Sequence, residues 1–282
     1  MNILGTGLSG LVGSRIVTLL SPENTFENLS LETGVDITNA EAVKKRIFDS
    51  NAPWVFHFAA YTNVQNAEKE KEIAWKVNVD ATQTIVNACK ETGKRILYID
   101  TDYAFDGKMK EGYSEDDLPN PLGWYAKSKS EGAKRVLAYD KGLVIRISNP
   151  YRANPVGKND FVHKILERLQ SGQSVIASSD QLFVPTFIDD IAIAIEKFLS
   201  INASGIYHVV GSPISPYEAA KTIATIYERD MSLVQPTTFS EYFANRAPVP
   251  QYAVLKNEKI TSIGVLIRDF SSGIKEMKKQ EA

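Results

Sequence analysis

The chain has 282 residues, of which 43% are hydrophobic and 23% are charged. This composition excludes a disordered chain and is enough for one large domain, or a main domain with a smaller lobe, around a sizeable core. Thirty-two basic and 34 acidic residues give a formal net charge of -2, so no broad positive field favours nucleic acid or an anionic membrane as the main partner.

The cysteine content and the amino terminus bear on the compartment. Cys89 is the only cysteine, which excludes an intramolecular disulfide and a cysteine-based metal cluster, and we expect it to be a buried hydrophobe. The segment MNILGTGLSG lacks a basic region followed by an apolar run and a cleavage site, and no stretch of about 20 apolar residues could span a bilayer. These features favour a soluble, cytoplasmic protein. The three histidines are too scattered to predict a metal site.

The first predicted strand, residues 1–4, leads directly into GTGLSGLVG and then into a helical pattern over residues 9–20. Glycines let the backbone approach a pyrophosphate closely, and the free N–H groups at a helix amino terminus favour an anion. The position of the turn between a strand and a helix favours a dinucleotide site over a purely structural glycine turn. The residues expected to contact the cofactor here are Gly7, Ser9, Gly10, Leu11 and Val12.

The second strand should end near an acidic residue about 20 positions after the glycine turn, where a carboxylate can bind the adenosine ribose. Glu32 and Asp36 are the candidates, with Ile37 beside them, although either carboxylate could belong to a loop. No arginine lies in residues 21–43 to meet a 2′-phosphate, so NAD(H) is slightly favoured over NADP(H). The basic residues at 44–46 could fold back and reverse that preference.

Two further predicted strands, residues 55–61 and 95–100, are almost continuously apolar until polar residues follow their carboxyl ends. Residues 40–48 and 79–93 show helical spacing of their apolar side chains. Strands that alternate with helices predict a parallel sheet covered on both faces. Ligands of such sheets bind beyond the carboxyl ends of the strands.

Residues 125–129 read YAKSK, which places Tyr125 and Lys129 on one face of a predicted helix. Such a pair is common on helices by chance, but beside a dinucleotide site it meets a chemical need, because a carbonyl that becomes an alcohol gains a proton as well as a hydride. A neighbouring ammonium favours the phenolate and can lower the pKa of the phenol from its usual value of about 10. Thr101, at the end of the strand 95–100, can donate its hydroxyl to the same oxygen.

The pattern changes after about residue 150, where prolines between residues 150 and 250 break the chain into shorter elements. Strand-like runs at 143–148 and 206–211 complete the alternation. We predict an α/β dinucleotide-binding domain in residues 1–150, with a return segment near 180–211, and a smaller lobe mainly in residues 151–282.

Two motifs resemble those of a known family. TGLSGLVG at residues 6–13 and YAKSK at residues 125–129 are similar to the TGxxGxxG and YxxxK motifs of the extended short-chain dehydrogenase/reductases. Within that family, the closest likeness is to the dTDP-4-dehydrorhamnose reductases. Further matching stretches follow in the expected order at residues 57–68, 100–107, 113–136 and 180–192.

The resemblance implies a Rossmann fold, a doubly wound parallel sheet with a smaller carboxyl-terminal substrate-binding lobe. It also implies an NAD(P)H-dependent oxidoreductase that reduces the 4-keto group of a nucleotide-linked deoxysugar, dTDP-4-dehydrorhamnose or a relative. Tyr125 would be the general acid, Lys129 would position the cofactor and lower the tyrosine pKa, and Thr101 would hydrogen-bond the keto oxygen. The segment that would flank the cofactor is Ala59, Ala60 and Tyr61, and the residue that would lie close to the sugar is Tyr103.

Three departures from the family pattern concern the substrate more than the chemistry. Asn149 stands where the family usually has a tryptophan near the nucleotide base, and base stacking contributes roughly 1 to 3 kcal/mol in comparable sites. Arg246, expected to grip the pyrophosphate, is one residue out of register with Pro248. Gln65 replaces an expected acidic residue, which puts an acid-dependent metal or subunit contact in doubt. Asn149 and Arg246 could instead be a turn residue and a solvated loop charge.

Two other functions remain open at this stage. A sugar-nucleotide epimerase or 4,6-dehydratase would regenerate the same cofactor, but dehydratases of this fold carry an Asp-Glu pair where this chain has Asp102 and Tyr103. A regulatory subunit resembling that of methionine adenosyltransferase would keep the dinucleotide fold without turnover. The expected partner is a nucleotide-sugar, with neither nucleic acid nor membrane, and the resemblance leaves room for a homodimer.

Overall fold

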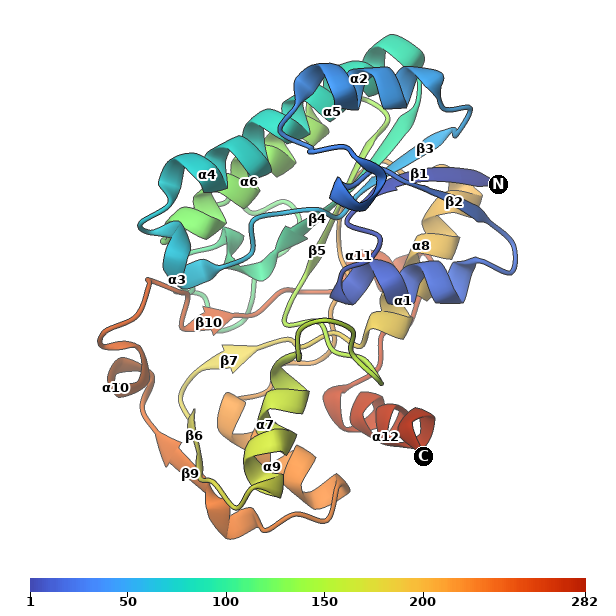
Figure 1. Ribbon diagram of the computed structural model, residues 1–282. Helices are drawn as coiled ribbons and strands as arrows, with labels where there is room; N and C mark the ends of the chain where they lie inside the picture. Colours follow the sequence, from blue (N-terminus) through green and yellow to red (C-terminus); the bar gives the residue numbers. More distant parts are fainter.

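The computed structural model describes residues 1–282, and a six-stranded parallel sheet forms its centre (Figure 1). The strand order is β2-β1-β3-β4-β5-β8, which confirms the predicted doubly wound α/β fold. Interior strands such as β3 and β5 are buried along their whole length, as expected for parallel strands covered on both faces. The strands are β1 (Asn2–Thr6), β2 (Thr25–Asn28), β3 (Trp54–His57), β4 (Arg95–Thr101), β5 (Gly142–Ile147) and β8 (Gly205–His208).

Helices cover the two faces of the sheet in separate layers (Figure 1). On one face, apolar side chains of β1, β3, β4 and β5 pack against three helices: α1 (Leu11–Leu20), α8 (Ile188–Ile201) and α11 (Glu258–Ser262). On the other face, they pack against α2 (Ala40–Asp49), α5 (Ala81–Thr92) and α6 (Trp124–Leu137). Cys89 lies buried in this second layer, as expected.

The second strand differs most from its predicted position. β2 has only four residues and ends at Asn28, four residues before Glu32, which lies in the 3-10 turn η1 (Leu31–Thr33). The strand expected over 55–61 also stops early, at His57, and residues 58–63 continue without regular structure. The expected helix over 79–93 begins as a π-helical stretch, η2 (Lys76–Asp80), before it becomes α5.

The later part of the chain adds a second group of shorter elements below the sheet (Figure 1). Its core contains α7 (Phe161–Gln170) and α9 (Pro216–Ile226), together with the carboxyl-terminal helix α12 (Phe270–Glu281). The division at residue 150 stays a prediction, since β8 and α8 belong to the central sheet and its covering layer. The remaining elements are β6 (Val175–Ser178), β7 (Leu182–Phe183), β9 (Val234–Thr237) and β10 (Tyr252–Ala253), η3 (Asp102–Ala104) and η4 (Met231–Leu233), and α3 (Val64–Ala67), α4 (Lys71–Trp75) and α10 (Phe239–Phe243).

Two buried or half-buried arginines join this later part to α1. Arg152 donates from Nη1 to Ser14 Oγ at 2.7 Å, and Arg15 donates from Nη2 to Gln280 Oε1 of α12 at 2.7 Å. These bonds fix the glycine turn that precedes α1 relative to the second group of elements. None of the helices combines the length and the apolar character that a membrane span requires.

Candidate active site

The glycine turn between β1 and α1 has the shape that a dinucleotide pyrophosphate requires. Gly7 has a φ of +66°, and a Cβ built on it would lie 2.5 Å from the amide nitrogen of Ala59. A Cβ on Gly13 would lie 2.2 Å from the carbonyl oxygen of Gly7, so this glycine lets α1 pack closely on the turn. Gly10 begins the helix without a side-chain cap, which leaves the first N–H groups of α1 available to an anion. The turn therefore fits the predicted cofactor.

The other residues expected at this turn lie at its mouth. Ser9 and Gly10 are exposed, while Leu11 and Val12 are partly buried at the start of α1.

The expected ribose-binding carboxylates lie near the end of β2 but outside the strand. Glu32 is exposed and accepts a hydrogen bond from Asn28 Nδ2 at 3.3 Å. Asp36 is exposed too, and its Oδ1 accepts from the backbone N–H of Thr38 at 2.8 Å, with Ile37 between them. The sequence reasoning missed Asn28 and Ser30, whose Oδ1 and Oγ atoms are buried without a hydrogen-bond partner. Their position at and just after the end of β2 could have identified them. The strand has only four residues, however, and shows no clear strand pattern in the sequence.

The segment after β3 is fixed by Asn78. The side chain of Asn78, on η2, accepts from the N–H of Tyr61 at 2.9 Å and donates to the carbonyl oxygen of Tyr61 at 3.1 Å and to Ser128 Oγ at 2.9 Å. Because Ser128 precedes Lys129 on α6, this contact ties the segment 59–61 to the helix that carries the Tyr-Lys pair. The structure thus brings Ala59, Ala60 and Tyr61 between the glycine turn and α6.

Tyr125 and Lys129 both lie on α6 and face the carboxyl end of β4. The rings of Tyr125 and Tyr103 meet edge to face with centroids 6.5 Å apart. The Lys129 ammonium lies 3.9 Å from the ring centroid of Tyr98, and the residue as a whole is almost fully buried. Burial lowers the pKa of Lys129 to about 8, and Asp100 opposes this effect.

The tyrosine differs from the expected phenol of lowered pKa. Burial raises the pKa of Tyr125 above its ordinary value, while the neighbouring Thr101 hydroxyl acts in the opposite direction. Burial is the largest effect, and the negative charges of Asp102 and Asp100 add to it. A phenol that stays protonated is suited to donating a proton.

Thr101 ends β4 in a small buried network. Its hydroxyl donates to Asp102 Oδ1 at 3.0 Å and accepts from the N–H of Tyr103 at 3.2 Å. Ser148 Oγ donates to the other oxygen of Asp102 at 2.6 Å. Burial raises the pKa of Asp102 to about 6, although these hydrogen bonds oppose the rise. Thr101 would have to turn its proton away from Asp102 to donate to a ligand.

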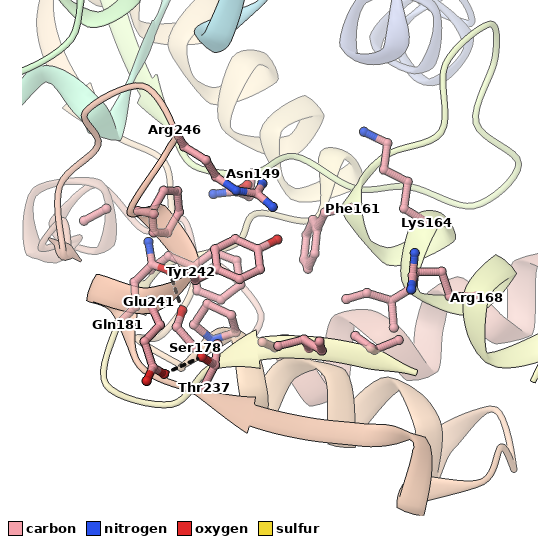
Figure 2. A pocket seen from close by; sticks show the side chains of 18 of the residues that line it. Asn149, Phe161, Lys164, Arg168, Ser178, Gln181, Thr237, Glu241, Tyr242 and Arg246 are labelled. Atoms are coloured by element: carbon pink, nitrogen blue, oxygen red, sulfur yellow. Dashed lines mark hydrogen bonds between the residues drawn. The ribbon is translucent and has the colours of Figure 1, made fainter. Parts of the chain in front are cut away.

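A cavity of about 660 Å³ is lined by all three of the residues expected at the substrate. Tyr103 is one of its lining residues. Figure 2 shows Asn149 and Arg246 at the cavity, together with Lys164 and Arg168 of α7. Asn149 has a φ of +39°, so it is a turn residue and a lining residue at once. The aromatic lining residues are Phe161, Phe183, Tyr242 and Phe243. In Figure 2, the bonds Ser178–Gln181 and Thr237–Glu241 lie at one end of the cavity, at 2.7 and 2.8 Å.

Arg246 is held by two contacts. Its guanidinium lies 4.2 Å from the ring centroid of Tyr242. The next residue, Ala247, donates its N–H to Gln65 Oε1 at 2.9 Å. Gln65, which stands where an acidic residue was expected, therefore anchors the loop that carries Arg246.

Comparisons with known proteins agree with this geometry. The model of the family "RmlD substrate binding domain" matches residues 1–282. The dTDP-4-dehydrorhamnose reductase of Aggregatibacter actinomycetemcomitans is 32% identical over 98% of both chains. A crystal structure of dTDP-4-dehydrorhamnose reductase from Bacillus anthracis in complex with NADP has a TM-score of 0.92 at 27% identity, over 99% of both chains. An ortholog of this reductase from Clostridium acetobutylicum has the same TM-score at 30% identity, also over 99% of both chains.

Proposed function

The chain belongs to the RmlD substrate binding domain family, and we propose that it is an NAD(P)H-dependent reductase of a nucleotide-sugar. The proposed substrate is the 4-keto group of a nucleotide-linked deoxysugar, dTDP-4-dehydrorhamnose or a relative. Two observations support the proposal. The glycine turn lets the backbone approach a pyrophosphate closely, and Tyr103, which lines the 660 Å³ cavity, meets the ring of Tyr125 edge to face. The family resemblance inferred from the sequence motifs is confirmed.

When bound at the glycine turn, a pyridine dinucleotide would supply the hydride that the keto carbon needs. Tyr125 donates the phenolic proton to the keto oxygen, and Thr101 donates a hydrogen bond to the same atom. Lys129 orients the cofactor, and its positive charge stabilises the phenolate left after proton transfer. The raised pKa of Tyr125 keeps the proton on the phenol until the substrate is in place.

The cavity residues would hold the rest of the substrate. Arg246, Lys164 and Arg168 supply cations for a diphosphate, and the aromatic rings supply faces for a base and a sugar. Tyr103 lies between this cavity and Tyr125, so it would contact the sugar next to the reacting group.

Both pyridine dinucleotides remain within the proposal. The related structure from Bacillus anthracis contains NADP, while the exposed Glu32 and Asp36 near the end of β2 favour the free ribose hydroxyls of NAD(H). The proposal also retains a homodimer and a cytoplasmic location, and sedimentation of the purified protein would test the former.

The experiment that tests the function follows NADH and NADPH oxidation with dTDP-4-keto-6-deoxysugars. Tyr125→Phe should lower kcat by about 10² to 10⁴, because the reaction loses its general acid, while cofactor affinity stays near that of the wild type. Tyr217→Phe is a matched control, since Tyr217 lies on α9 and does not line the cavity. Cofactor binding without turnover on the whole substrate panel would instead favour the regulatory-subunit function.

A further inference from the structure

A row of buried charged and polar side chains crosses the sheet just below the candidate active site. Asp100, Arg146 and His208 are register partners on β4, β5 and β8. Arg146 Nε donates to Asp100 Oδ2 at 3.0 Å, and the two side chains are 3% and 0% exposed. Charged side chains are rarely buried this completely unless they are paired.

His208 on β8 contacts Arg146 on the side opposite to Asp100. His208 Nδ1 lies 3.0 Å from the carbonyl oxygen of Lys256, which can only accept, so Nδ1 carries the proton. Burial and the neighbouring Arg146 lower the pKa of His208 to about 3. The neutral ring therefore presents the lone pair of Nε2 to Arg146 Nη1 at 3.4 Å. The guanidinium also lies 4.9 Å from the ring centroid of Phe105.

These contacts use only one oxygen of the Asp100 carboxylate. The other oxygen, Oδ1, is buried and has no hydrogen-bond partner. A buried carboxylate oxygen without a partner is costly, so its retention calls for a physical reason.

The Lys129 ammonium is the nearby cation that also lacks a partner. It lies on the ring of Tyr98, in a residue that is 4% exposed, and takes part in none of the chain's ion pairs. Tyr98 and Asp100 are two residues apart on β4, so they point to the same face of the sheet at a spacing of about 7 Å. The free oxygen of Asp100 and the side chain of Lys129 therefore lie on the same side of β4, towards α6, although no ion pair within 4.0 Å joins them.

We propose that Asp100 is a positioning residue, whose free carboxylate oxygen is the counter-charge that keeps the Lys129 ammonium protonated and in place. The inference rests on the proposed function in that Lys129 serves the reaction. A lysine buried without such a charge would lose its proton near neutral pH, and with it the ability to stabilise a phenolate.

The other titratable groups around Lys129 cannot take this role. His57 on β3 is neutral, because burial lowers its pKa to about 3. Tyr98 and Tyr125 stay protonated, because burial raises the pKa of both phenols. The stretch η2 places the uncharged Asn78 against α6, and its charged ends are exposed. Arg146 is a cation and is compensated by Asp100 itself.

The test is Asp100→Asn, which keeps the shape of the side chain and removes the charge. We expect the pKa of Lys129, followed by NMR of ¹³C-labelled lysine and assigned with Lys129→Gln, to fall by about one unit. The alkaline limb of kcat/KM for reduction should move to lower pH by the same amount. A variant that loses activity equally at every pH, with an unchanged Lys129 pKa, would overturn the proposal and indicate a purely structural role.

Removal of the carboxylate leaves Arg146 as an unpaired buried charge, so a second variant guards against misfolding. In Asp100→Asn/Arg146→Met, Arg146 is no longer present as an unpaired buried charge, and we expect a smaller fall in the Lys129 pKa because a repelling cation is lost as well. A wild-type pKa in this variant would also overturn the proposal. A lowered Lys129 pKa in a protein that reduces no sugar would refute the proposed function and leave the role of Asp100 intact.

Discussion

The candidate cofactor site requires a residue without a side chain at position 7. We expect Gly7→Ala to weaken cofactor binding at least tenfold and to destabilise the fold, because the new Cβ would meet the backbone of Ala59 at 2.5 Å and the φ of +66° is unfavourable for alanine. Cofactor fluorescence titration and urea unfolding would measure the two effects.

Gly34 provides the matched control for this prediction. It also has a positive φ, +78°, but a Cβ there would meet nothing within 4 Å. Gly34→Ala should therefore cost only the backbone strain, about 1 kcal/mol, and leave cofactor affinity unchanged. Equal effects of the two substitutions would show that backbone strain alone, rather than the close approach to Ala59, explains the requirement for glycine at position 7.

The helix or strand that carries a candidate site residue was predictable where a local sequence motif includes that residue. Tyr125 and Lys129 are four apart on one helix, and Thr101 ends a clearly apolar strand, so short-range spacing was enough to place them. The pairing of Asp100 with Arg146 depends on the register of two strands 46 residues apart in the chain, which no local pattern encodes. The raised pKa of Tyr125 was missed for a related reason, since burial depends on tertiary packing.

At the scale of elements, the carboxyl-terminal helix α12 is fastened to α7 by a titratable contact. The two ring nitrogens of His163 each lie 2.9 Å from a carboxylate, that of Asp160 on one side and that of Glu281 on the other. Burial lowers the pKa of His163, but the hydrogen bonds to these carboxylates outweigh burial and raise it to about 9. The contact is therefore charged at neutral pH.

This contact predicts how stability changes with pH. Because the folded pKa of His163 is above its unfolded value of about 6.5, its stabilisation is complete below that value and is lost as the pH rises through about 9. We expect His163→Gln to lower the midpoint of thermal unfolding at pH 6.5 and to have little effect at pH 10. Unfolding monitored by circular dichroism over this range is the measurement. A difference between wild type and variant that stays constant with pH would refute the predicted linkage.

Elements were predictable in proportion to their length and periodicity. α1, α2 and β4 match their predicted ranges within two residues, since each shows a regular apolar pattern. The four residues of β2 give no such pattern, because the strand lies at the edge of the sheet and is only partly buried. Two residues, Glu32 and Asp36, were therefore candidates for the carboxylate expected at the ribose.

For the whole molecule, the packing of α8 connects the two parts of the chain. The core cluster on the face of the sheet that α1, α8 and α11 cover has 20 buried residues, and more than half of them lie beyond residue 150. The return segment near 180–211 thus contributes side chains to this core, and we expect that the first 150 residues cannot close it by themselves. Its large buried members include Ile188, Ile191, Ile195, Phe198 and Leu199.

A fragment of residues 1–150 should not fold cooperatively without α8. Full burial of an Ile, Leu or Phe side chain contributes about 1.5 to 3 kcal/mol, so loss of the five large side chains named above removes free energy comparable to the about 5 to 15 kcal/mol that stabilises a whole domain. We expect the fragment to bind ANS and to unfold without a cooperative transition in urea. The same fragment joined through a flexible linker to residues 180–211, which restores α8 and β8, should unfold more cooperatively. A sharp transition in the shorter fragment, at the wild-type midpoint, would mean that residues 1–150 fold independently and that α8 only covers a sheet that is already stable.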